Sequence, residues 1–96
     1  MDLMTTPTLP ADAQLVRTTP EFTATTVPSG LLAAHQVAAA TWGRLCVRQG
    51  SVTFVFEDDR EHPVRVASGG HVDIPPERPH HVEPDGDAVF VVEFYR

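Results

Sequence analysis

The sequence contains no lysine and only one cysteine, and both shortages limit what the chain can do. Its seven basic residues are all arginines, spread from Arg17 to Arg96, against thirteen acidic residues, for a net charge of -6. Without a basic cluster, binding to nucleic acid or to an anionic membrane lacks its usual electrostatic source, so we expect neither partner. The lone Cys46 cannot form a disulfide within the chain or build a cysteine-only metal site.

Long apolar runs are also missing. No stretch approaches the roughly 20 apolar residues that a membrane helix needs. Residues 1–15 do not combine a basic region with an apolar run, so we expect no secretory signal and a cytoplasmic protein. The chain has 96 residues, of which 42% are hydrophobic, which fits one domain with a small core. Association into a homodimer would supplement so small a core.

Short apolar runs alternate with turn residues from Val27 onward, a pattern typical of an antiparallel all-β domain. The turn at Gln49-Gly50-Ser51 is expected to join two strands as a hairpin. The last strand is apolar almost throughout, so we expect cover on both its faces, from the N-terminal arm or a partner subunit. About seven strands are expected, with little or no helix: residues 31–37, 44–48, 52–57, 63–67, 71–74, 81–83 and 88–95.

The N-terminal quarter of the chain is rich in threonine and proline and shows no helical period. We expect residues 1–10 to be disordered and residues 11–26 to lie extended on the domain. The domain itself is expected to span residues 11–96. Closing its strands into a single antiparallel, jelly-roll-like barrel would remove exposed strand edges.

The segment from Gly69 to His80 is the most informative stretch. It consists of a glycine, five residues, Pro75 and Pro76, and then Glu77-Arg78-Pro79-His80. Because proline lacks the N–H that a sheet needs, this segment predicts a rigid connection that delivers His80 to the start of the next strand. It resembles the second motif of the cupin superfamily, which has a glycine where this chain has Glu77.

The first cupin motif is matched only in part. Gly50 fits its glycine, but Gly43 occupies the glutamate position and the paired histidine positions fall on apolar residues. His35 is the one histidine in that region. The usual shell of three histidines and one glutamate is therefore incomplete.

Further short motifs follow one another over residues 9–96: residues 27–32, His35, residues 42–45, Gly50, residues 75–77, His80, residues 82–83 and residues 92–96. Their order and spacing resemble the TehB/YeaR-like family of small cupins. The resemblance implies a cupin-type β-barrel and a link to tellurite, other oxyanion or nitrosative stress. It implies no methyl transfer, because 96 residues leave no room for the methyltransferase domain that some members carry.

Two histidines and a carboxylate would suit a divalent Fe, Zn or Mn ion with open coordination positions. We expect His35 and His80 to converge in the barrel interior as metal ligands. The third ligand is Glu83 or Glu93: Glu83 has the wrong parity for an ideal strand, and Glu93 would need a partner when buried. His81 should point away from His80, because neighbouring residues of a strand face opposite sides.

Four further residues are expected to line the mouth of the barrel, namely Trp42, Arg44, Glu93 and Tyr95. Three functions are open at this point. The first is a metal-binding cupin that binds or senses a small molecule or anion. The second is an enzyme whose metal activates water or O₂. The third is a metal-free module that binds a small molecule or a protein partner.

Overall fold

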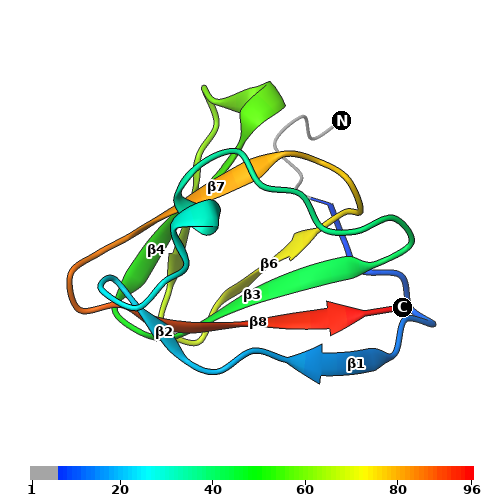
Figure 1. Cartoon of the computed structure of the whole chain (residues 1–96), viewed down its shortest axis with the longest axis horizontal. Coiled ribbons are helices and arrows are strands. Elements are labelled where there is room, and N and C mark those ends of the chain that lie inside the picture. Colours follow the sequence, from blue (N-terminus) through cyan, green and yellow to red (C-terminus); the bar gives the residue numbers. More distant parts are fainter. Residues whose placement is uncertain (1–6) are drawn as a thin grey trace.

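The computed structural model describes residues 7–96 and contains β-strands and short 3-10 turns (Figure 1). The prediction of an all-β, antiparallel domain with little helix is confirmed. No helix in residues 7–96 is long and apolar enough to cross a membrane. In chain order the elements are β1 (Leu15–Thr18), β2 (Phe22–Thr23), η1 (Ser29–Leu32), β3 (Trp42–Gln49), β4 (Ser51–Phe56), η2 (Glu57–Asp59), β5 (Val64–Ala67), β6 (His71–Ile74), β7 (His80–Pro84) and β8 (Val89–Tyr95).

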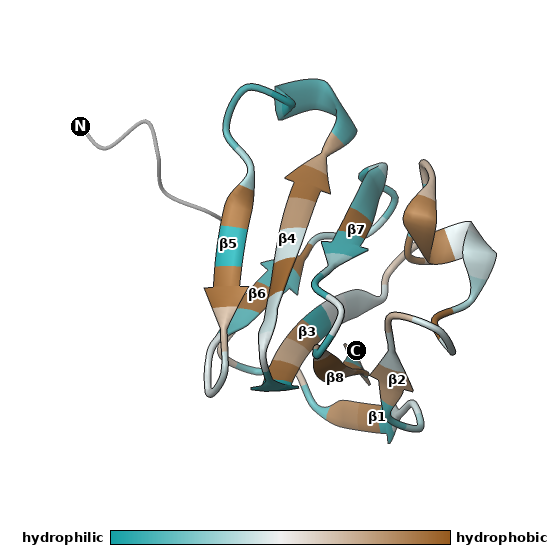
Figure 2. Cartoon of the chain, turned by 90° about the vertical axis from the view of Figure 1, so that its left-hand side faces the viewer, coloured by the Kyte–Doolittle hydropathy of each residue, from teal (hydrophilic) through white to brown (hydrophobic). Residues whose placement is uncertain are grey.

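The strands form two sheets that face each other across the core (Figure 2). The larger sheet has the order β1-β8-β3-β6, with β2 also paired to β8, and the smaller sheet has the order β5-β4-β7. The two sheets are separate hydrogen-bonded units, so the domain is a jelly-roll-like sandwich instead of one continuous cylinder. Its core consists of residues from both inner faces, with Leu45, Val52, Phe54, Ile74 and Phe90 almost completely buried.

The chain around Gly50 does not form the hairpin that the sequence predicts. β3 pairs with β6 and β8, whereas β4 pairs with β5 and β7, so Gly50 turns the chain from one sheet to the other. Its φ angle is +65°, and a Cβ there would lie 2.7 Å from the Asp87 carboxylate. The chain turns sharply between the sheets, instead of forming a hairpin, because β3 and β4 each bury one apolar face. The turn places these two faces opposite each other.

Residues 31–37 do not form the expected strand. They start in the 3-10 turn η1 and continue irregularly, with only His35 forming an isolated β-bridge, to His80. The many alanines of this region supply few large side chains for a core, and Leu32 is exposed. Val27, four residues before this segment, and Val37, at its end, are buried and anchor this part of the chain to the sandwich.

The apolar strand β8 is covered by the fold of the chain itself. It lies between β3 on one edge and β1 and β2 on the other, so residues 11–26 do lie on the domain as expected. Phe90 faces the core, and Val91 is buried although it faces the other side. The homodimer stays a prediction, which sedimentation would test. The feature that now supports it is the edge strand β1, where Leu15 and Val16 are each more than half exposed.

Part of the N-terminal region predicted to be disordered, residues 1–6, lies outside the described residues. Within residues 7–10, the backbone N–H of Leu9 donates a hydrogen bond of 2.8 Å to the carboxylate of Asp73. Asp73 is buried on β6, so its acceptor oxygens need such donors.

Glu77 has a φ angle of +62°, at the position where the cupin motif has glycine. This left-handed conformation costs a residue with a Cβ about 1–2 kcal/mol. We therefore predict that Glu77→Gly raises the free energy of unfolding by about 0.5–1 kcal/mol, after the greater freedom of glycine in the unfolded chain is subtracted. Urea unfolding measures the change. Glu77→Ala is the matched control, and an equal gain with alanine would show that the backbone is not the cause.

Candidate functional site

His35 and His80 meet between the two sheets. Their backbones exchange two hydrogen bonds, 2.8 Å from His35 N–H to the His80 carbonyl and 2.9 Å in the reverse direction. Their rings pack edge to face with centroids 5.6 Å apart. The structure thus brings together the two histidines that the sequence singled out, and the bridge that does so joins the irregular segment 33–41 to the first residue of β7.

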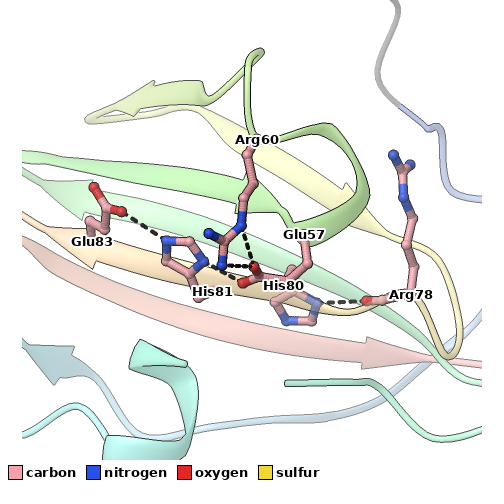
Figure 3. Close-up of polar contacts among 6 residues, drawn as sticks. All are labelled: Glu57, Arg60, Arg78, His80, His81 and Glu83. Carbon is pink, nitrogen blue, oxygen red and sulfur yellow. Dashed lines mark hydrogen bonds and ion pairs between the residues drawn. The ribbon is translucent and has the colours of Figure 1, made fainter. Parts of the chain in front are cut away.

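The imidazole of His80 is held in one orientation and one tautomer. Its Nδ1 lies 3.0 Å from the backbone carbonyl oxygen of Arg78, which can only accept, so Nδ1 carries the proton (Figure 3). Phe54 stacks on the ring with centroids 5.0 Å apart. Burial lowers the pKa of His80, against the smaller opposite effect of the Arg78 carbonyl. The ring is therefore neutral near pH 7, and its Nε2 has a lone pair available for a donor or a metal.

Both histidines line a cavity of about 310 Å³ between the two sheets. Most of the other residues on its wall are apolar and come from both sheets and from the segment 28–37. The cavity lies within the size range of small-molecule sites, and its mainly apolar wall with a few polar groups is typical of them. Among its lining residues are Phe22, Leu31, Val37, Leu45, Phe54, Ile74, Val82, Val92 and Phe94.

Glu83, predicted as a metal ligand, does not join the two histidines. It lies on the opposite face of β7 from His80, where its carboxylate is 2.8 Å from Nε2 of His81 (Figure 3). His81 is also 2.5 Å from Glu57 through its Nδ1, and Arg60 contacts the same Glu57 carboxylate. The strict alternation of β7 causes this separation, which turns His80 inward and both His81 and Glu83 outward.

Trp42, Arg44, Glu93 and Tyr95 were expected at the cavity mouth, but they do not line this cavity. They lie on the outer face of the larger sheet, where the register sets Trp42 opposite Tyr95 and Arg44 opposite Glu93. Arg44 forms a two-point ion pair with Asp73, at 2.6 and 3.2 Å. The Tyr95 hydroxyl donates a 2.7 Å hydrogen bond to Glu93. The correction follows from parity, because these residues alternate with the inward-facing Leu45 and Val92.

The donor atoms around the cavity are too few for a complete metal site built by the protein alone. In the part of the chain that the structure describes, no group of three or more His, Cys, Asp or Glu side chains is placed to hold a metal ion. Catalytic zinc sites use three protein ligands and structural sites use four. The two imidazoles of His35 and His80 would supply only two.

Sequence reasoning missed two residues that shape the cavity. The contact of Phe54 with His80 was not predicted, because a stacking partner on another strand leaves no local signal in the sequence. Arg17 lies in the segment predicted to be an extended arm, yet it lines the cavity from β1. Its register position opposite Phe94 on β8 explains how it reaches there.

Comparison with known proteins agrees with this architecture. The model of the TehB-like domain family matches residues 17–92. A protein from Escherichia coli K12 superposes with a TM-score of 0.86 at 23% identity, over 94% of this chain and 96% of that one. No curated protein matches the sequence.

Two other solved structures are similar as well. TehB from Haemophilus influenzae superposes with a TM-score of 0.80 at 23% identity, and the match covers 88% of this chain but 32% of that one. A cupin-2 domain protein from Shewanella frigidimarina gives a TM-score of 0.54 at 18% identity, over 90% of this chain and 72% of that one. At these identities the likeness shows the fold, which is of cupin type.

The neighbours His80 and His81 have pKa shifts of opposite sign. Burial alone would lower the pKa of His81, but its hydrogen bonds to Glu57 and Glu83 outweigh burial and raise it. The native state therefore holds this proton more tightly than the unfolded chain. That stabilisation is complete below the ordinary value of about 6.5 and is lost as the pH rises through the raised pKa. For His80 the sign is reversed, and stability falls as the pH drops below about 6.5.

We predict that His81→Gln lowers the free energy of unfolding by roughly 0.5–1 kcal/mol more at pH 6 than at pH 9, after allowance for solvent screening. Urea unfolding at the two pH values measures the difference. Glu83→Gln removes one of the two carboxylates and should give a smaller difference of the same sign. Equal losses at both pH values would contradict the ion pairing of His81.

Proposed function

The chain belongs to the TehB-like domain family, and from this premise we propose that it is a small-molecule-binding cupin. Its ligand occupies the cavity between the sheets, against His35 and His80. The proposal is binding in the first place, because the described lining offers a proton acceptor at His80 but no carboxylate to act with it.

One observation carries this proposal, namely a neutral imidazole held in one tautomer on the wall of an apolar cavity. The Nδ1–H of His80 donates to the Arg78 carbonyl, and Phe54 stacks on the ring. A ring fixed in this way loses little freedom when a ligand binds, which favours affinity. Its Nε2 accepts a hydrogen bond from a hydroxyl or N–H group of the ligand, and the surrounding apolar wall packs against the rest of that molecule.

A divalent ion is the second candidate for this site. The observation in its favour is the hydrogen bond from Nδ1 of His80 to the Arg78 carbonyl. Proteins use such a bond to orient a histidine that binds a metal through its other ring nitrogen. His35 and His80 would hold the ion, and water or donor atoms of the ligand would supply the rest of its shell. Fe, Zn and Mn in their divalent states all accept imidazole ligands.

A role in the response to tellurite or to other oxyanion or nitrosative stress is supported by family membership alone. Such a role describes the conditions under which the protein acts. It does not identify the molecule that the cavity binds. Growth of cells with and without the gene on tellurite would decide it, and equal sensitivity would remove this role while leaving the binding proposal intact.

We predict that the protein binds phenol more tightly than toluene, because only phenol donates a hydrogen bond to Nε2 of His80. His80→Phe keeps an aromatic ring and removes the acceptor. It should weaken phenol binding by about tenfold and leave toluene binding unchanged, since a buried hydroxyl without a partner costs about 1–3 kcal/mol. Titration followed by methyl NMR signals of the lining valines measures both affinities. Loss of toluene binding in the variant would mean that the cavity itself had changed.

If a metal is held at the two histidines in the native state only, chelation should destabilise the protein. Binding at a hundredfold excess over Kd contributes about 2.7 kcal/mol, and each kcal/mol shifts the melting temperature of such a domain by about 4–8 °C. EDTA should then lower the melting temperature by more than about 10 °C, and His80→Phe should abolish this effect. If protein prepared without an affinity tag contains no metal, and EDTA leaves its melting curve unchanged, the metal site is excluded. The metal-free binding module is then the function that remains.

A further inference from the structure

Arg17 is one of two arginines that form no ion pair with a carboxylate among residues 7–96. Among residues 7–96 the Arg17 guanidinium forms no ion pair and no hydrogen bond. The other arginine without an ion pair, Arg96, donates a hydrogen bond of 3.3 Å to the Thr41 hydroxyl. Five other arginines form ion pairs with carboxylates: Arg44 with Asp73, Arg48 with Glu21, Arg60 with Glu57, Arg65 with Asp85 and Arg78 with Asp58.

The place of Arg17 is set by the pairing of β1 with β8. Arg17 lies opposite Phe94 in the register, and its guanidinium carbon is 4.7 Å from the centre of the Phe94 ring. Stacking on an aromatic face orients the planar guanidinium while its N–H groups stay free at the edge. Both residues line the cavity, and Arg17 is exposed, so the cation stands where the cavity opens to solvent.

The rest of the described lining makes this charge locally dominant. It contains no aspartate and no glutamate, and the buried His80 is neutral near pH 7. The Thr19 hydroxyl is already engaged, since it donates to the Pro20 carbonyl and accepts from the N–H of Val92. A cavity of about 310 Å³ has space for about ten water-sized groups of about 30 Å³ each.

We infer that the cavity takes small apolar monocarboxylates, with the carboxylate paired to Arg17 at the opening and the apolar body packed between the sheets. The inference rests on the proposed function of the cavity. A planar guanidinium matches a carboxylate through two parallel hydrogen bonds. An inorganic oxyanion fits less well, because Arg17 would be the one cation holding it. Such an ion also has no apolar part to pack against the apolar wall of the cavity.

The test compares 3-phenylpropionate with 3-phenylpropionamide, which has the same number of non-hydrogen atoms and no charge. Isothermal titration calorimetry with the wild-type protein should give a Kd about tenfold or more lower for the carboxylate, and this preference should shrink at high salt. Arg17→Gln should abolish the preference by weakening carboxylate binding alone. Arg65→Gln, which removes a positive charge from an exposed ion pair elsewhere, should keep the preference.

The outcomes separate this inference from the proposal beneath it. Equal affinities for both probes in the wild-type protein, or an unchanged preference in Arg17→Gln, would overturn the role of Arg17 and leave a binding cavity. Failure of both probes to bind, while phenol binds, would overturn the ligand class. If phenol and toluene do not bind either, the proposed function fails with it. Thermal melting checks that each variant is folded.

Discussion

The backbone bridge between His35 and His80 is the interaction on which the site depends. Two hydrogen bonds join these residues, and the N–H of Glu77 donates a third, of 2.8 Å, to the Val37 carbonyl. Together they fasten the irregular segment 33–41 to the proline turn before β7. Without them, nothing in the described backbone would hold this segment against the open edge of the small sheet, where it forms one wall of the cavity.

The sequence was informative where local chemistry is decisive. The prolines around Glu77 predicted a rigid connection that ends at an inward histidine, and alternation along β7 predicted that His81 would point the other way. Both features depend only on backbone geometry over a few residues. The family resemblance was equally informative about the cupin-type fold, because the order of short motifs reflects the order of turns.

Prediction failed where the answer depends on contacts between distant parts of the chain. Gly50 indicates a sharp turn. Whether such a turn joins two paired strands of one sheet or leads the chain from one sheet to the other depends on where the buried faces of the two strands pack. The placement of Arg44 at the cavity mouth failed for a different, local reason: alternation with the inward-facing Leu45 turns Arg44 outward, toward Asp73 on β6. Glu93 likewise finds Tyr95 on the outer face, and the same carboxylate adds to burial in raising the pKa of Cys46 to about 11. That thiol is protonated at neutral pH, which agrees with a structural role.

The weak attachment of the segment 28–41 has a consequence for how a molecule reaches the interior. Among the described residues, three backbone hydrogen bonds tie this segment to the rest of the fold, whereas each strand of the sandwich shares a ladder with its neighbours. Widening the opening of the cavity therefore requires only a small, local movement of this segment that leaves both sheets intact. Exchange of the interior with solvent is separated energetically from unfolding, so the domain can be stable and still admit and release its contents.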